Sequence, residues 1–140
     1  MNLILSQDAD YLATAEHLWE KRFDEARECY TKCMRKTDSS LQKSLMLCLI
    51  AKTYSQQDLT EMASRFFRDA ELIDRSGTSC FMHSQFLFDI GDNAAAIRKC
   101  MKAIQLAKKD KESTMEDSQF AISLYEESIL EYRKKNRKKK

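Results

Sequence analysis

The 140-residue chain contains no proline and only two glycines, Gly77 and Gly91. Because turns and sheets in globular proteins normally draw on both residue types, their scarcity favours helices joined by short turns. Charged residues make up 33% of the chain and apolar residues 43%. We therefore expect one soluble, all-α domain that is long enough to bury a core.

The chain also lacks a long apolar run. No stretch approaches the ~20 apolar residues that a membrane-spanning helix needs, and residues 1–5 are too short and lack the basic start of a secretory signal. The cysteines are odd in number and cannot all pair within one chain, which favours a reducing compartment. They are Cys29, Cys33, Cys48, Cys80 and Cys100. We expect a complete chain, from Met1 and the terminal basic run, located in the cytoplasm or the nucleus.

The net charge of +2 is unevenly distributed. The last eight residues hold seven of the 24 basic groups, so the other 132 residues carry 17 basic and 22 acidic groups, a net charge of −5. Such a tail is typical of a solvated end, a nuclear-localisation signal, a nucleic-acid contact or an anionic membrane contact, although no lipidation motif accompanies it. Its basic residues are Arg133, Lys134, Lys135, Arg137, Lys138, Lys139 and Lys140.

One pattern occurs three times: a small residue, a bulky or thiol residue four positions later, and a small residue three further on. The copies are Ala26-x3-Tyr30-x2-Cys33, Ala63-x3-Phe67-x2-Ala70 and Ala96-x3-Cys100-x2-Ala103. They are 37 and 33 residues apart, which indicates a repeat array. Repeat arrays build extended binding surfaces, so a binding function is favoured.

The sequence predicts seven helices, over about 7–20, 23–36, 39–57, 58–74, 78–90, 93–109 and 114–133. Capping patterns begin the third, fourth and seventh at Ser39, Asp58 and Ser113. Gly77 suits a left-handed backbone conformation after the end of the fourth helix. Gly91-Asp92 is typical of a tight turn. Turns of two to four residues make consecutive helices antiparallel.

The second helix pair has the fullest pattern: Leu47-x2-Ile50-Ala51-x2-Tyr54 precedes Ala63-x3-Phe67-x2-Ala70. This resembles the tetratricopeptide repeat (TPR), with its W-x2-L-G-x2-Y, A-x3-F and P positions. The family's helix-ending proline is replaced by Asp38, Arg75 and Lys108, which loosens the expected helix ends. The other copies are Cys80-x2-His83-Ser84-x2-Leu87, Tyr11-x2-Thr14-Ala15-x2-Leu18 with a shorter turn, and Phe120-Ala121-x2-Leu124, which no partner helix follows.

The resemblance implies an antiparallel helix-hairpin superhelix, an α-solenoid. It divides residues 1–132 into repeats at about 7–38, 44–77 and 77–110 and a capping helix at 114–132, and leaves 133–140 as a basic tail. The capping helix would cover the open end of the last hairpin with one stripe. The stripe residues are Ala121, Leu124, Tyr125, Ser128 and Tyr132.

The resemblance also implies a concave groove lined by the first helix of each hairpin. The implied groove residues are Leu12, Glu16, Trp19, Cys48, Lys52, Ser55, Phe81, Gln85, Phe88 and Asp89. Aromatic residues in a concave surface suit a peptide or an amphipathic helix of a partner protein. Alternatively, the aromatics pack against the first or last helix, or the groove holds another copy of the chain.

One branch of the family binds acidic chaperone tails through a clamp of converging cations. The matching positions here hold Leu49, Thr78 and Met82, and only Lys52 adds a positive charge. A carboxylate needs several cations to offset its desolvation, so we do not expect this ligand.

Few residues suggest catalysis. His17 and His83 are far apart in sequence, and the repeat register makes His83 a packing residue. Cys29 and Cys33 could share a metal at i, i+4, but no second ligand pair accompanies them. We predict a non-enzymatic adaptor without cofactor that binds a protein segment; the alternatives are a nucleic-acid-associated protein using the tail and a structural subunit or homodimer.

Overall fold

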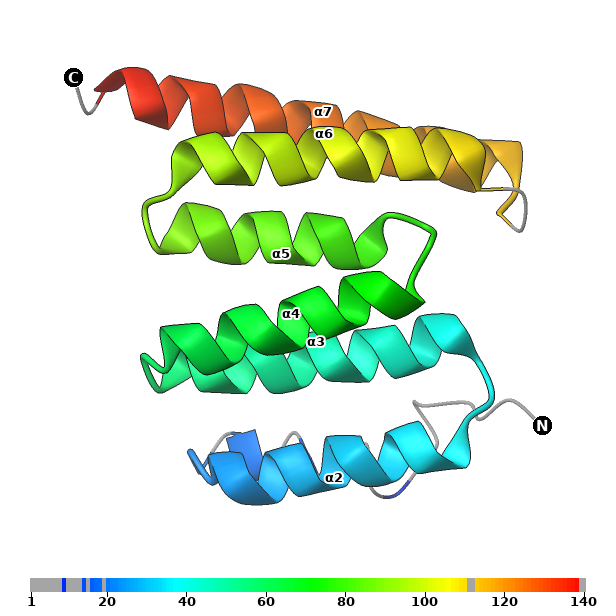
Figure 1. The fold of residues 1–140 in the computed structure, drawn as a ribbon, viewed down its shortest axis with the longest axis vertical. Coiled ribbons are helices and arrows are strands. Elements are labelled where there is room, and N and C mark those ends of the chain that lie inside the picture. The colour runs from blue at the N-terminus through cyan, green and yellow to red at the C-terminus, as the bar shows by residue number, and fades with distance from the viewer. Residues whose placement is uncertain (1–8, 10–13, 15, 19, 111–112, 139–140) are drawn as a thin grey trace. The chain divides into compact units, whose positions relative to one another are not determined.

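The computed structural model describes residues 9, 14, 16–18, 20–110 and 113–138. These residues form α-helices and no strand, labelled α2 to α7 in Figure 1. The helices are α2 (Phe23–Lys36), α3 (Ser40–Gln56), α4 (Thr60–Ile73), α5 (Thr78–Asp89), α6 (Asn93–Lys109) and α7 (Met115–Lys138). The all-α prediction is confirmed. Most of the expected helix at 7–20 lies outside the described residues, although residues 16–18 are helical.

The chain divides into two compact units, Met1–Ile73 and Asp74–Lys140. In the first unit α2 packs on α3 and α3 on α4; in the second α5 packs on α6 and α6 on α7. Consecutive helices within each unit lie side by side in Figure 1. The short connections reverse the chain, as the turn lengths predicted.

Three turns share one hydrogen-bonding geometry. Each has a left-handed residue after the helix end, at Lys21 (φ 59°), Asp58 (φ 60°) and Gly91 (φ 92°). The next amide donates to a carbonyl five residues back: Arg22 to His17 (2.7 Å), Leu59 to Tyr54 (2.9 Å) and Asp92 to Leu87 (2.9 Å). This is the Schellman motif. The left-handed positions are 37 and 33 residues apart, so the backbone repeats with the sequence pattern.

Two sequence predictions about helix starts were wrong. Asp58 was expected to open the fourth helix, but it closes α3, and α4 begins at Thr60. Ser113 was expected to cap the seventh helix, but the hydroxyl of Thr114 accepts the bond from the Asp117 amide at 3.1 Å. Both errors arise because adjacent Ser, Thr and Asp residues can each cap a helix, and the backbone conformation decides between them.

Gly77 is left-handed as predicted, with φ 99°, but its place differs. It is the N-cap of α5 and not the residue that closes α4. Because glycine offers no capping side chain, the buried Asp74 takes this role. Its carboxylate accepts the amides of Ser76 and Ser79, each at 2.8 Å.

The nine residues of the threefold pattern are all buried, none of them more than 5% exposed. In the first unit Tyr30 and Cys33 of α2 pack with Met46 and Ile50 of α3. In the second unit the core joins α5, α6 and α7; its residues are Cys80, Phe81, Ala96, Cys100, Ala103, Ala107, Tyr125, Ile129 and Tyr132. All five cysteines are buried free thiols. Cys33 and Cys100 are packing residues of the two cores.

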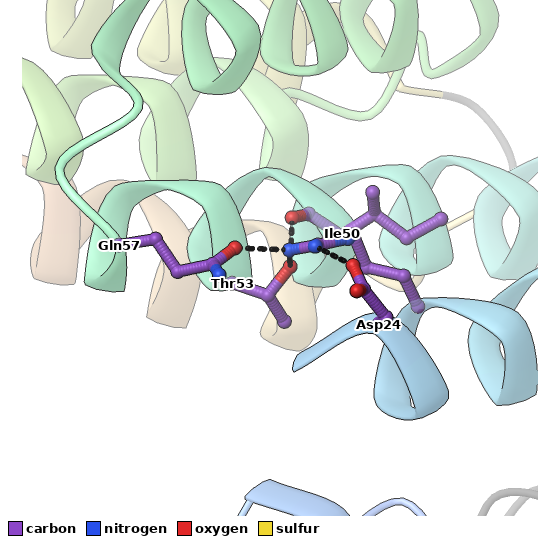
Figure 2. A network of polar contacts seen from close by, with 5 residues as sticks. Asp24, Ile50, Thr53 and Gln57 are labelled. Atoms are coloured by element: carbon purple, nitrogen blue, oxygen red, sulfur yellow. Dashed lines mark hydrogen bonds and ion pairs between the residues drawn. The ribbon is translucent and has the colours of Figure 1, made fainter. Parts of the chain in front are cut away.

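Arg27 joins α2 to α3 through the contacts drawn in Figure 2. Its guanidinium donates to the Thr53 hydroxyl (3.1 Å) and the Gln57 side-chain oxygen (2.7 Å) and pairs with Asp24 (2.5 Å). The guanidinium carbon also lies 4.1 Å from the centre of the Tyr54 ring. Since the Arg27 side chain is only 12% exposed, this cluster anchors the two helices together.

α7 departs from its predicted end. The sequence predicted a capping helix to about residue 132 and a separate tail over 133–140, whereas α7 continues to Lys138. The basic residues are good helix formers and no proline or glycine interrupts them, so the helix continues. Residues 139 and 140 lie outside the described part. Across the described residues, no helix is long and apolar enough to cross a membrane.

Candidate functional site

The structure divides the predicted groove residues into exposed and buried groups. In the first unit Glu16 and Lys52 are exposed, Ser55 is half-buried and Cys48 is 0% exposed. Cys48 therefore belongs to the interior and offers no surface to a partner. Leu12 and Trp19 lie outside the described residues.

In the second unit α7 packs against both predicted groove aromatics. Phe81 is 8% exposed, and its ring centre lies 4.5 Å from that of Tyr125. Phe88 stacks on Tyr132 with the same 4.5 Å separation. Packing against the last helix was the alternative to a free groove. Phe81 is covered in this way, whereas Phe88 remains half-buried and keeps part of its ring accessible.

The accessible part of Phe88 has polar neighbours. Gln85 and Asp89 are exposed and lie three positions before it and one after it on α5. On α7, the Lys135 ammonium lies 4.9 Å from the centre of the Phe88 ring. This cluster, which we call the Phe88 face (Gln85, Phe88, Asp89 and Lys135), combines one fixed aromatic ring with a hydrogen-bonding amide and charges of both signs.

The sequence prediction about the buried stripe of α7 is partly wrong. Tyr125 and Tyr132 are each 4% exposed, as expected, but Leu124 is 41% exposed. Ile129, which was not predicted, is 7% exposed and joins the core instead. A helix turns 100° per residue, so positions 125, 129 and 132 lie on one face of α7. Position 124 lies on another side of the helix.

Phe120 is an exposed aromatic residue outside the predicted groove set. It is 75% exposed on α7. The repeat pattern aligns it with Ile50 and His83, which are 3% and 5% exposed. The sequence could have indicated this exposure, because Phe120-Ala121-x2-Leu124 has the pattern of the first helix of a hairpin and the sequence predicted no second helix to pack on it.

His83 and Cys100 are buried residues of the second unit. His83 is 5% exposed beside Phe86, which confirms its predicted packing position. Burial raises the pKa of the Cys100 thiol to about 11, although a hydrogen bond with Ser84 acts in the opposite direction. This thiol stays protonated at neutral pH and is a poor nucleophile. Within the described residues, no group of three or more His, Cys, Asp or Glu side chains could hold a metal.

The charge of α7 is divided along its length. Residues 115–132 include five acidic groups and no basic one, whereas basic residues dominate from position 133 onward. Arg133, Lys134 and Lys135 are exposed on this helix. The described part of the predicted tail is therefore a helical basic cluster and not a separate extended segment.

No protein-family model matches the chain, and no curated protein matches it.

Proposed function

We propose that the chain is a non-enzymatic interaction module of the TPR type, an adaptor that holds a peptide or amphipathic helix of a partner protein. The observation that carries this proposal is the Phe88 face. It presents an aromatic side chain on a rigid helix, with polar groups at its edge.

The packing of Phe88 favours recognition. Because the ring is already held by Tyr132, little side-chain entropy is lost when a partner covers its accessible part. Rigid aromatic anchors surrounded by polar contacts are typical of the residues that dominate interface energies. Gln85 and Asp89, both exposed on α5, would orient the partner.

Affinity capture followed by mass spectrometry would identify a partner, and the purified pair would then be titrated by calorimetry. We expect Gln85→Arg to weaken binding about tenfold or more, because a longer charged side chain would enter the contact. Gln105→Arg makes the same change at an exposed position of α6 and is the matched control. Equal affinities of the two variants would refute binding at the Phe88 face.

The basic end of α7 supports a second candidate, a nucleic-acid-associated protein. Exposed cations on a regular helix follow a phosphate backbone better than scattered ones, and such binding weakens steeply with salt. We expect duplex or single-stranded RNA to bind at low salt and to be released as salt rises. Absence of binding at low salt, or equal binding by a variant in which Arg133, Lys134 and Lys135 are replaced by Gln, would exclude this candidate.

A further inference from the structure

α7 has a second apolar surface, on the side away from its buried residues. Phe120 and Leu124 lie one turn apart and are 75% and 41% exposed. Ala121 lies beside them and is half-buried. We call Phe120 and Leu124 the open face of α7; the Phe88 face, to which α7 contributes Lys135, lies nearer the C-terminal end of this helix.

The repeat register shows what covers this surface elsewhere. Leu124 corresponds to Tyr54 of α3 and Leu87 of α5. Tyr54 stacks on Phe66 of α4, with ring centres 5.4 Å apart, and Leu87 packs on the core that includes Ala96 and Cys100 of α6. At Tyr54, then, the following helix supplies part of the cover, and Arg27 of the preceding helix supplies another part.

The small residue at position 121 fits the same role. Its counterparts, Ala51 and Ser84, are both 0% exposed. Small residues at these sites allow two helix backbones to approach closely. Ala121 keeps this feature on α7, where it packs against the core that α7 shares with α5 and α6 and stays only half-buried.

Acidic side chains border the open face at both ends. Glu116 and Asp117 lie one turn before Phe120, while Glu127 and Glu131 follow Leu124 at successive turns of the same side. All four are exposed. A helix that covers Phe120 and Leu124 would therefore be stabilised by lysine or arginine at its flanks.

The same charges argue against pairing of α7 with a second copy. An antiparallel pair that places position 120 against position 124 of the other copy also places acidic position 117 against acidic position 127. Like charges directly opposite each other destabilise a helix pair. A basic partner helix could cover Phe120 and Leu124 without placing acidic side chains against each other.

We propose that the open face of α7 binds a basic amphipathic helix of another protein. This helix runs antiparallel to α7 and carries the pattern small-x3-bulky-x2-small, so that it takes the place that α4 and α6 occupy in their hairpins. The partner completes a fourth hairpin in trans.

The chain itself supplies a probe for this chemistry. Residues 92–109 contain Ala96, Cys100 and Ala103 in the required spacing, with five basic residues and one acidic residue, the cap Asp92. A fluorescent synthetic peptide of this sequence with Cys100→Phe has a bulky central residue and no reactive thiol. A second peptide in which the five basic residues are replaced by Glu keeps the spacing and reverses the charge.

Binding of both peptides to the full chain would be followed by fluorescence anisotropy. We expect the basic peptide to bind and the acidic peptide to bind at least tenfold more weakly. Phe120→Ser and Leu124→Ser should each weaken the basic peptide several-fold. Leu130→Ser, at a 59% exposed position on another side of α7, should leave its affinity unchanged. Circular dichroism would confirm that all variants stay helical.

Several results would overturn the proposal. They are absence of peptide binding, equal binding of the two peptides, or equal loss in the Leu130→Ser control. Sedimentation that shows a dimer of the wild-type chain and a monomer of Phe120→Ser would assign the open face to a second copy instead. Gln85→Arg should not affect the peptide, so this test is independent of the Phe88 face.

Discussion

Gly77 lies against the carbonyl group of Ala103, where a Cβ atom on residue 77 would come within 2.5 Å of the carbonyl oxygen. The first turn of α5 therefore approaches the backbone of α6 more closely than any side chain would permit. Two requirements coincide at this residue, a left-handed backbone (φ 99°) and the absence of a side chain.

We predict that Gly77→Ala lowers the free energy of unfolding by roughly 3 kcal/mol, because left-handed strain adds to the backbone clash. Gly91→Ala is the matched control. Gly91 has φ 92°, but its added Cβ would meet nothing within 4 Å, so only the strain of about 1 kcal/mol applies. Urea denaturation followed by circular dichroism measures both values. Similar losses would show that the contact with Ala103 has no energetic consequence.

Asp58 occupies the left-handed position that glycine takes at residue 91. We predict that Asp58→Gly stabilises the protein by about 0.5–1 kcal/mol, because it relieves left-handed strain in the Schellman turn. The adjacent Gln57 has φ −95°. Gln57→Gly should therefore destabilise through added chain entropy in the unfolded state. A lower thermal midpoint for Asp58→Gly would contradict this account of the repeated turn.

Arg27 connects α2 with α3 through two side-chain hydrogen bonds and the Tyr54 ring. We predict that Arg27→Ala lowers the free energy of unfolding by about 1–2 kcal/mol, since both bonds involve a charged group and the bond to Thr53 is partly buried, whereas the bond to Gln57 lies at the surface. Asp24→Ala is the control: its side chain is 91% exposed, so its ion pair should contribute less than about 0.5 kcal/mol. Denaturation curves in which both variants lose equal stability would assign the effect to the surface pair.

Cys100 should make stability fall at alkaline pH. Burial raises the folded-state pKa of its thiol to about 11, from 9.0 for an exposed cysteine. Between these two values the unfolded chain releases this proton and the folded chain retains it, so the free energy of unfolding decreases as pH rises, by about 2–3 kcal/mol in total. Below pH 9 the thiol has no such effect.

Comparison of wild type with Cys100→Ala by urea denaturation at pH 8 and pH 10.5 isolates this contribution. Burial also raises the pKa values of Tyr125 and Tyr132, so both proteins should lose some stability at pH 10.5. The wild type should lose more. An equal pH dependence in the two proteins would show that the Cys100 thiol titrates normally.

Local patterns predicted much of the helical fold. The bounds of α2 and α6 match the predicted ranges, since apolar spacing and Asp92 mark them clearly. The residues that close α3 and cap α7 were misplaced, because neighbouring polar residues offer equivalent caps. The groove was the least predictable part. Register can align Phe81 and Phe88 with an inner face, but it cannot show that the rings of Tyr125 and Tyr132 pack against them.

The sequence by itself determined the repeat: its spacing placed the buried small residues and the approximate positions of the turns, because helix period and residue size act locally and along the whole chain. Only the tertiary structure decided which apolar residues remain exposed. Phe81 and Phe120 have the same apolar character, yet α7 buries the first against Tyr125 and leaves the second open. Exposure depends on which helix is packed against a given face, and that is a property of the packed helices and not of any one segment.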